Sequence, residues 1–139
     1  MKTDYQNVTW TEIENMTKLL YDKISAISKD FSSISTSWGG LVPARLLADY
    51  MGLDVIFVDK NKIPTHSLFV DDIYDSGNTF KKIIQKITDS SNLVYATLFA
   101  RRGKKYPKQL VYAKKTKGNE YIVYPWDKLE HKRLNDFSM

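Results

Sequence analysis

Cysteine is absent from this sequence, and histidine occurs only twice. The lack of cysteine excludes a disulfide framework and a thiolate-bound metal centre. His66 and His131 stand far apart in the chain, so neither indicates a catalytic pair or a metal site. Long apolar runs are also lacking, and residues 1–10 are polar. We therefore expect no membrane span, no secretion signal and a cytoplasmic location.

Repeats, low-complexity tracts and linkers rich in proline or serine are lacking as well, so nothing in the sequence indicates a domain boundary. The chain has 139 residues, of which 42% are hydrophobic and 13% aromatic. A chain of this size and composition can bury a core without disulfides. We expect residues 1–139 to form a single domain.

Positive charge is in excess, with a formal net charge of +5. This excess favours anionic partners, and phosphorylated small molecules and nucleic acids both meet that description. Basic residues cluster at 101–105 and 114–117, where the ordinary interpretation is a solvated surface. Charge alone does not choose between these partners.

Hydrophobic periodicity divides the chain into alternating helices and strands. The first helix begins with a capping box, in which Thr9 is followed by Glu12, and Gly52 would end the second helix. Helices are expected at residues 10–27, 41–51 and 79–87. Strands are expected at residues 33–37, 55–58, 68–71, 93–100, 109–113 and 121–124, with 55–58 a buried strand.

This alternation predicts an α/β fold, in which a mostly parallel sheet is flanked by helices. In such sheets a ligand binds beyond the carboxyl ends of the strands. The rule directs attention to the loops that follow strands 33–37, 68–71 and 93–100.

The loop after strand 68–71 contains the most specific pattern in the sequence. A Gly-containing turn at residues 76–79 opens a helix, so its backbone amides are placed to bind a phosphate. The hydroxyls of Ser76 and Thr79 add donors, and Gly77 permits close approach of the backbone.

Three carboxylates accompany this turn. Asp71 and Asp72 do not suit a phosphate because like charges repel, but they suit ribose hydroxyls or a magnesium ion, bound directly or through its waters. Asp75 lies within the turn and is a candidate to accept a proton from a base. A strand followed by an Asx turn and a helix cap would explain one or two of these aspartates, but not all three.

Residues 70–79 resemble the phosphoribosyl pyrophosphate signature of the type I phosphoribosyltransferases. Four further segments resemble parts of the bacterial xanthine-guanine enzymes of that family: the N-terminus at 8–10, the pyrophosphate loop and following helix at 37–44, and the base-binding segments at 99–101 and 121–127. The likeness therefore runs from about residue 8 to residue 127, with the segments in the family's order.

The resemblance implies a type I phosphoribosyltransferase fold with a small C-terminal base-binding segment. It implies Mg²⁺ as cofactor, phosphoribosyl pyrophosphate and a purine-like base as substrates, a homo-oligomer (dimer or tetramer), and a cis or otherwise strained peptide between Ser37 and Trp38. The implied site residues are Asp71 and Asp72 for ribose and magnesium, Asp75 for catalysis, Asp75, Ser76, Gly77, Asn78 and Thr79 for the 5′-phosphate, Ser37, Trp38 and Gly39 for pyrophosphate, and Arg101, Tyr121 and Ile122 for the base.

The sequence departs from the family pattern at three places. Trp38 stands where relatives usually have a basic residue, and Arg101 stands where they have a lysine. Only residues 59–67 separate two strands that usually enclose a long mobile lid. Closure of the site would then come from the charged tail at 128–139 or from a second subunit.

Two functions follow from these observations. The first is an enzyme that transfers ribose 5-phosphate to a purine-like base in nucleotide salvage and releases pyrophosphate. The second is a non-catalytic regulator on the same fold, which binds phosphoribosyl pyrophosphate or a nucleotide and contacts RNA through its lysine-rich face. The three aspartates favour the enzyme, whereas Trp38 and the short connection at 59–67 favour the regulator.

Overall fold

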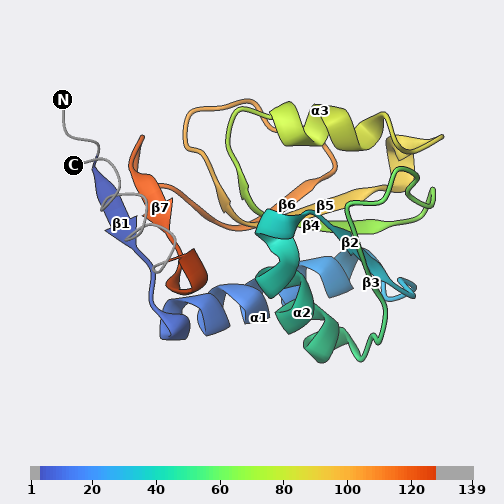
Figure 1. Cartoon of the computed structure of the whole chain (residues 1–139), viewed down its shortest axis with the longest axis horizontal. Coiled ribbons are helices and arrows are strands. Elements are labelled where there is room, and N and C mark those ends of the chain that lie inside the picture. Colours follow the sequence, from blue (N-terminus) through green and yellow to red (C-terminus); the bar gives the residue numbers. More distant parts are fainter. Residues whose placement is uncertain (1–3, 128–139) are drawn as a thin grey trace.

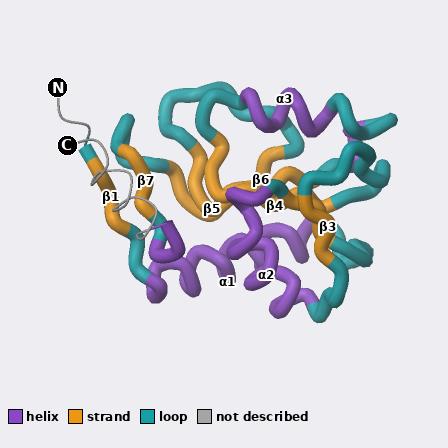
Figure 2. Tube along the Cα trace, in the orientation of Figure 1, coloured by secondary structure: helices purple, strands orange, loops and turns teal. Residues whose placement is uncertain are grey.

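A parallel sheet of five strands forms the centre of the molecule, in a computed structural model that describes residues 4–127. The strands are β2 (Ile34–Thr36), β3 (Ile56–Val58), β4 (Leu68–Tyr74), β5 (Val94–Ala100) and β6 (Leu110–Lys115). Their order in the sheet is β3-β2-β4-β5-β6. Figure 2 shows the strands as a layer between helices, which confirms the expected α/β fold.

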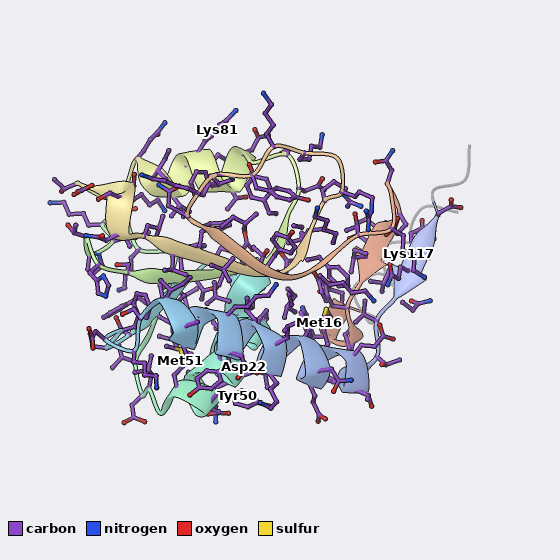
Figure 3. All side chains as sticks on the ribbon, turned by 180° about the vertical axis from the view of Figure 1, so that it is seen from behind. Met16, Asp22, Tyr50, Met51, Lys81 and Lys117 are labelled. Atoms are coloured by element: carbon purple, nitrogen blue, oxygen red, sulfur yellow. The ribbon has the colours of Figure 1, made fainter. Side chains whose placement is uncertain are left out.

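Helices cover both faces of this sheet (Figure 1). One face is covered by α1 (Trp10–Ile27) and α2 (Leu41–Met51), and the other by α3 (Asn78–Ile84). Each layer encloses an apolar cluster, and Met16 of α1 lies in the first (Figure 3). Short 3₁₀ turns form at η1 (Trp38–Gly40), η2 (Ser90–Asn92) and η3 (Pro125–Asp127). Within residues 4–127, no helix has the length and apolar character needed to span a membrane.

The predicted start of α1 and the predicted end of α2 are confirmed. The side chain of Thr9 accepts a hydrogen bond from the backbone N–H of Glu12 at 3.1 Å, so the capping box forms as expected. Helix α2 ends at Gly52, whose φ of 67° lies in the left-handed region that glycine adopts at little cost. These signals are local, which is why the sequence is sufficient to predict them.

A second, two-stranded parallel sheet lies beside the first (Figure 1). It pairs β1 (Tyr5–Asn7) with β7 (Tyr121–Val123). The sequence analysis does not expect β1, because three residues are too few to display an alternating pattern. Strand β1 is defined by its pairing with a segment near the other end of the described chain.

The six expected strands all form, with ends that differ by at most three residues, and the third expected helix, 79–87, is observed at Asn78–Ile84. Two of the differences concern the site and the edge of the sheet. Strand β4 continues past residue 71 to Tyr74, because its pairing with β5 extends to Tyr74 and Ala100. Asp72 therefore lies within the strand rather than after it, as does Asp71. The expected buried strand at 55–58 is wrong in its burial: Phe57 is exposed, because β3 is at the edge of the sheet.

The connection at residues 59–67 starts at the carboxyl edge of the sheet, where the backbone N–H of Asp59 donates to the carbonyl of Thr36 at 3.0 Å, and is held further along near the end of α3. Ile63 is buried in the apolar cluster beneath α3, and its backbone N–H donates to the carbonyl of Lys86 at 3.0 Å. The connection is therefore held against the end of α3. Its position agrees with the expectation that it is too short to act as the usual lid.

The turn η1 packs directly on the sheet. A Cβ atom on Gly40 would contact the carbonyl oxygen of Val70 and would lie 2.5 Å from Oγ1 of Thr36 and 2.8 Å from Cα of Asp71. A Cβ on the neighbouring Gly39 would have no atom closer than 3.8 Å. Gly40 is thus required for close approach, whereas Gly39 is not.

We predict that Gly40→Ala lowers the free energy of unfolding by about 1–3 kcal/mol, because the added methyl group must displace backbone atoms of β4. Gly39→Ala is the matched control and should change stability little. Urea denaturation of the two variants measures the difference. Equal stabilities would contradict the tight packing of η1 on β4.

Candidate functional site

A cavity of about 330 Å³ opens at the carboxyl ends of β2 and β4. Its lining residues are Ser37, Gly39, Asp71, Asp72, Ile73, Tyr74, Asp75, Ser76, Gly77, Asn78, Thr79, Phe80 and Tyr95. The cavity contains all the residues expected to bind ribose and 5′-phosphate, and two of the three expected to bind pyrophosphate.

Asp71 is a buried carboxylate whose two oxygens are both hydrogen-bonded. Only 5% of the residue is exposed. Its Oδ2 accepts the hydroxyl of Tyr95 at 2.8 Å, and its Oδ1 accepts the backbone N–H of Asp72 at 2.9 Å. Tyr95 packs against Phe69, with parallel rings 5.4 Å apart, and this contact holds the hydroxyl in place. Tyr95 is a functional residue that the sequence does not reveal, because in sequence it is an ordinary strand residue. Its proximity to Asp71 follows only from the pairing of β4 with β5.

Asp72 is the carboxylate left to interact with a ligand. Its Oδ1 accepts the backbone N–H of Ile73, at 2.8 Å. Its backbone carbonyl accepts the hydroxyl of the buried Tyr124, also at 2.8 Å. The Asp72 carboxylate lies 3.8 Å from the position that a Cβ on Gly39 would occupy. Asp72 therefore connects the turn after β2 with the turn after β4.

The charge of Asp72 is poorly compensated in the free protein. Burial, together with the neighbouring carboxylate of Asp71, raises the pKa of Asp72 to about 8. Burial and the charge of Asp71 also raise the pKa of Tyr95, which therefore remains a protonated donor. Asp72 therefore keeps its proton up to neutral pH in the free protein.

Of the two carboxylates of Asp71 and Asp72, only one is available to a metal ion. Among the described residues, no group of three or more His, Cys, Asp or Glu side chains is arranged to hold a metal ion. Both oxygens of Asp71 already have partners. Asp72 is therefore the residue that fits Mg²⁺, with water and substrate oxygens as the remaining ligands, in keeping with the preference of this ion for retained waters.

The turn at residues 75–79, called the phosphate turn below, contains one residue in the left-handed region of the backbone. Gly77 has a φ of 87°, and a Cβ at this position would lie 2.7 Å from the hydroxyl oxygen of Tyr74. The side chain of Ser76 accepts the backbone N–H of Asn78 at 3.3 Å. Helix α3 has only seven residues, so an anion at this turn would depend on the turn's amides and hydroxyls more than on the helix dipole.

Arg101 lies beside this turn, but it does not line the cavity. Its Nε donates to Oδ1 of Asp75 at 3.1 Å, and its Nη2 lies 3.4 Å from Oδ2 of the same residue. Its Nη1 donates to the carbonyls of Gly118 and Glu120. The structure therefore places Arg101 on the acidic residue of the phosphate turn rather than on an open base site.

The remaining expected site residues are more distant from the cavity. Tyr121 is 51% exposed, and its ring meets that of Tyr5 edge to face. The side chain of Ile122 is buried in the core. Trp38 is 76% exposed and does not line the cavity. The cis or otherwise strained peptide expected between Ser37 and Trp38 is wrong for this structure: all peptide bonds of the described residues are trans, and Ser37 has ordinary extended geometry, with a φ of −96° and a ψ of 173°.

We predict that the unliganded protein becomes less stable between about pH 4 and pH 8. The native state keeps a proton on Asp72 that the unfolded chain releases near its ordinary pKa of 3.8, so the raised pKa stabilises the fold below that range. Asp72→Asn should remove this slope and raise the free energy of unfolding at pH 9 by about 1–3 kcal/mol. Denaturant unfolding across this pH range is the measurement, and Asp54→Asn, at an exposed position, is the control. A slope that persists in Asp72→Asn would contradict the assignment.

Comparison with solved structures finds the same fold in phosphoribosyltransferases. No protein-family model and no curated protein sequence matches the chain. Among solved structures, a xanthine-guanine-hypoxanthine phosphoribosyltransferase of Helicobacter pylori aligns over 95% of this chain and 99% of its own, with a TM-score of 0.75 and 19% identity. A purine phosphoribosyltransferase of Pyrococcus horikoshii aligns over 88% and 94%, with a TM-score of 0.71 and 21% identity.

A third solved structure is a hypothetical protein of Neisseria gonorrhoeae with bound ppGpp. It aligns over 100% of this chain and 99% of its own, with a TM-score of 0.69 and 20% identity. These likenesses show that the chain has the fold of the type I phosphoribosyltransferases. The resemblance inferred from residues 70–79 is thereby confirmed at the level of the fold.

Proposed function

We propose that this protein transfers ribose 5-phosphate from phosphoribosyl pyrophosphate to a purine-like base, giving a nucleoside monophosphate and pyrophosphate. The observation that carries the proposal is the single cavity that joins the turn after β2, the Asp71–Asp72 pair and the turn at 75–79. Two phosphate-binding turns with carboxylates between them match the chemistry of a substrate that has phosphate at both ends of a ribose.

Each part of the cavity has a distinct role in this reaction. The amides and hydroxyls of residues 76–79 hold the 5′-phosphate. Asp72 accepts hydrogen bonds from the ribose hydroxyls, and Asp71 acts through the backbone N–H of Asp72 to position it. Mg²⁺, when bound near Asp72 with its waters, would neutralise charge on the departing pyrophosphate. Fixing the two reactants in line supplies much of the rate, because the protein has no covalent step to perform.

Asp75 is the candidate proton acceptor for the incoming base. Its carboxylate is exposed at the cavity and is held by Arg101. As the base nitrogen attacks the anomeric carbon, the base must lose a proton, and a fixed carboxylate nearby can accept it. The resemblance assigns the base to Arg101, Tyr121 and Ile122, and that assignment remains a prediction.

Closure of the site requires an element other than residues 59–67, which are anchored to α3. The tail at 128–139 lies outside the described residues. A second subunit, in a dimer or tetramer, is the other candidate. Exclusion of water matters for this reaction because hydrolysis of phosphoribosyl pyrophosphate competes with transfer.

A second function, a non-catalytic nucleotide-binding regulator, is favoured by one specific observation. The neighbour from Neisseria gonorrhoeae, whose structure contains ppGpp, matches this chain over its full length. A nucleotide with two pyrophosphate groups has the anionic groups that the two turns would bind. The exposed basic residues at 102–105 and 114–117 add the lysine-rich face through which such a regulator would contact RNA. Arg101 is buried and is not part of that face.

Turnover distinguishes these functions. The protein is incubated with phosphoribosyl pyrophosphate, Mg²⁺ and each of hypoxanthine, guanine, xanthine and adenine, and nucleoside monophosphate and pyrophosphate are quantified. Formation of both products in equal amounts supports the transferase. Tight binding of phosphoribosyl pyrophosphate or ppGpp without consumption of phosphoribosyl pyrophosphate by any base would replace the transferase with the regulator.

We predict that Thr79→Val weakens the binding of phosphoribosyl pyrophosphate about 10-fold, because the isosteric change removes one hydroxyl donor to a charged phosphate. Thermal stability should stay nearly the same, since Thr79 is exposed in the cavity. Thr88→Val is the matched control, at an exposed position that does not line the cavity. Calorimetric titration compares the three proteins, and equal affinities would place the phosphate elsewhere.

A further inference from the structure

Arg101 is held almost completely by the protein itself. It is 8% exposed, although it lies at the carboxyl end of β5, next to the cavity. Its backbone N–H donates to the carbonyl of Tyr74 at 2.7 Å, and its own carbonyl accepts the hydroxyl of Tyr106 at 2.7 Å. Both ends of this residue, the backbone and the guanidinium, are therefore fixed.

The guanidinium joins two segments that are distant in sequence. On one side it contacts both carboxylate oxygens of Asp75, in the phosphate turn. On the other side its Nη1 donates to the carbonyls of Gly118 and Glu120, at 3.0 and 2.8 Å. Four of its five N–H donors are used in this way, which leaves one on Nη2.

The segment that receives Arg101 is itself closed by hydrogen bonds. The carboxylate of Glu120 accepts the backbone N–H groups of Lys117 and Gly118, both at 2.8 Å. Thr116 donates from its hydroxyl to the carbonyl of Gly118 at 3.0 Å. These contacts turn two carbonyl oxygens toward the same guanidinium nitrogen. Residues 116–120 lead directly into β7, beside which Lys117 is seen in Figure 3.

We infer that Arg101 is a positioning residue that latches residues 116–120, and with them the start of β7, to Asp75 of the phosphate turn. Through this latch, binding of a phosphate at the phosphate turn is coupled to the conformational order of residues 116–121. The inference rests on the proposed function for the roles of the two segments, but not for the latch itself.

This role differs from a direct contact between Arg101 and the base. To bind an exocyclic oxygen of the base through Nε or Nη1, Arg101 would have to release Asp75 or a carbonyl of the 116–120 segment. The role also explains why an arginine stands at this position. A planar guanidinium can donate to a carboxylate on one edge and to carbonyls on another, whereas the point charge of a lysine cannot span both.

The latch is tested first in the ligand-free protein, by amide hydrogen exchange. Arg101→Lys should speed exchange at residues 116–121 at least fivefold, with the melting temperature nearly unchanged. Asp75→Ala removes the acceptor at the other end and should have a similar effect, so the test does not depend on the folding of one variant. Arg45→Lys is the matched control, because Arg45 makes an exposed contact with Asp49 on α2. Unchanged exchange in both latch variants would overturn the inference.

The coupling is tested with phosphoribosyl pyrophosphate and Mg²⁺ as the probe. In the natural protein, binding should slow exchange at residues 75–79 and at 116–121 together. In Arg101→Lys, binding should still slow exchange at residues 75–79 but should no longer slow exchange at residues 116–121. In the same variant, KM for the base should rise about 10-fold, while kcat changes less than threefold. Protection of both regions in the variant would overturn the coupling. Loss of base binding with unchanged exchange at 116–121 would show instead that Arg101 contacts the base.

Failure of the proposed function gives a separate result. If the natural protein shows no protection at residues 75–79 with this probe, the phosphate-site assignment is wrong. The ligand-free comparison of Arg101→Lys and Asp75→Ala then still decides whether the latch exists.

Discussion

The close contact between the turn after β2 and the carboxyl end of β4 is the constraint on which the site depends. Thr36 donates from its hydroxyl to the carbonyl of Val70 at 2.6 Å, and Gly40 has no side chain to keep the two backbones apart. This contact brings Gly39 to the carboxylate of Asp72. The two turns that bind anions in the proposed reaction therefore face each other across one cavity, at a spacing set by backbone packing.

The same packing creates an electrostatic imbalance that a ligand can correct. Asp71 and Asp72 are adjacent, and only Asp71 receives two donors at its carboxylate. Asp72 is left with a raised pKa, which means that the folded protein disfavours its charge. Ribose hydroxyls or a cation would compensate that charge. The free energy gained by this contact at Asp72 would then help to orient the ribose in the proposed reaction. Groups arranged for function in this way often lower the stability of the unliganded protein.

The fold alone does not decide between a transferase and a nucleotide-binding regulator, because function depends on the site built upon the fold. The intact cavity, with Asp71, Asp72 and Asp75, meets the requirements of transfer. The connection at 59–67 is held near the end of α3 by Ile63, so the proposed transfer depends on another element to cover the site. In the proposed reaction, closure of the site would separate transfer to a base from binding without turnover.

The sequence by itself determined the phosphate turn, the helix caps and the class of fold. These features were predictable because their groups are neighbours in the chain: the turn and its carboxylates span residues 71–79, and Thr9 caps a helix through Glu12. Only the tertiary structure decided the partners of those groups. Tyr95 reaches Asp71 through strand pairing, and Arg101 joins Asp75 to residues 118–120 across a loop. Strand order and register bring these residues together, and hydrophobic periodicity, which reports only on local structure, does not specify either of them.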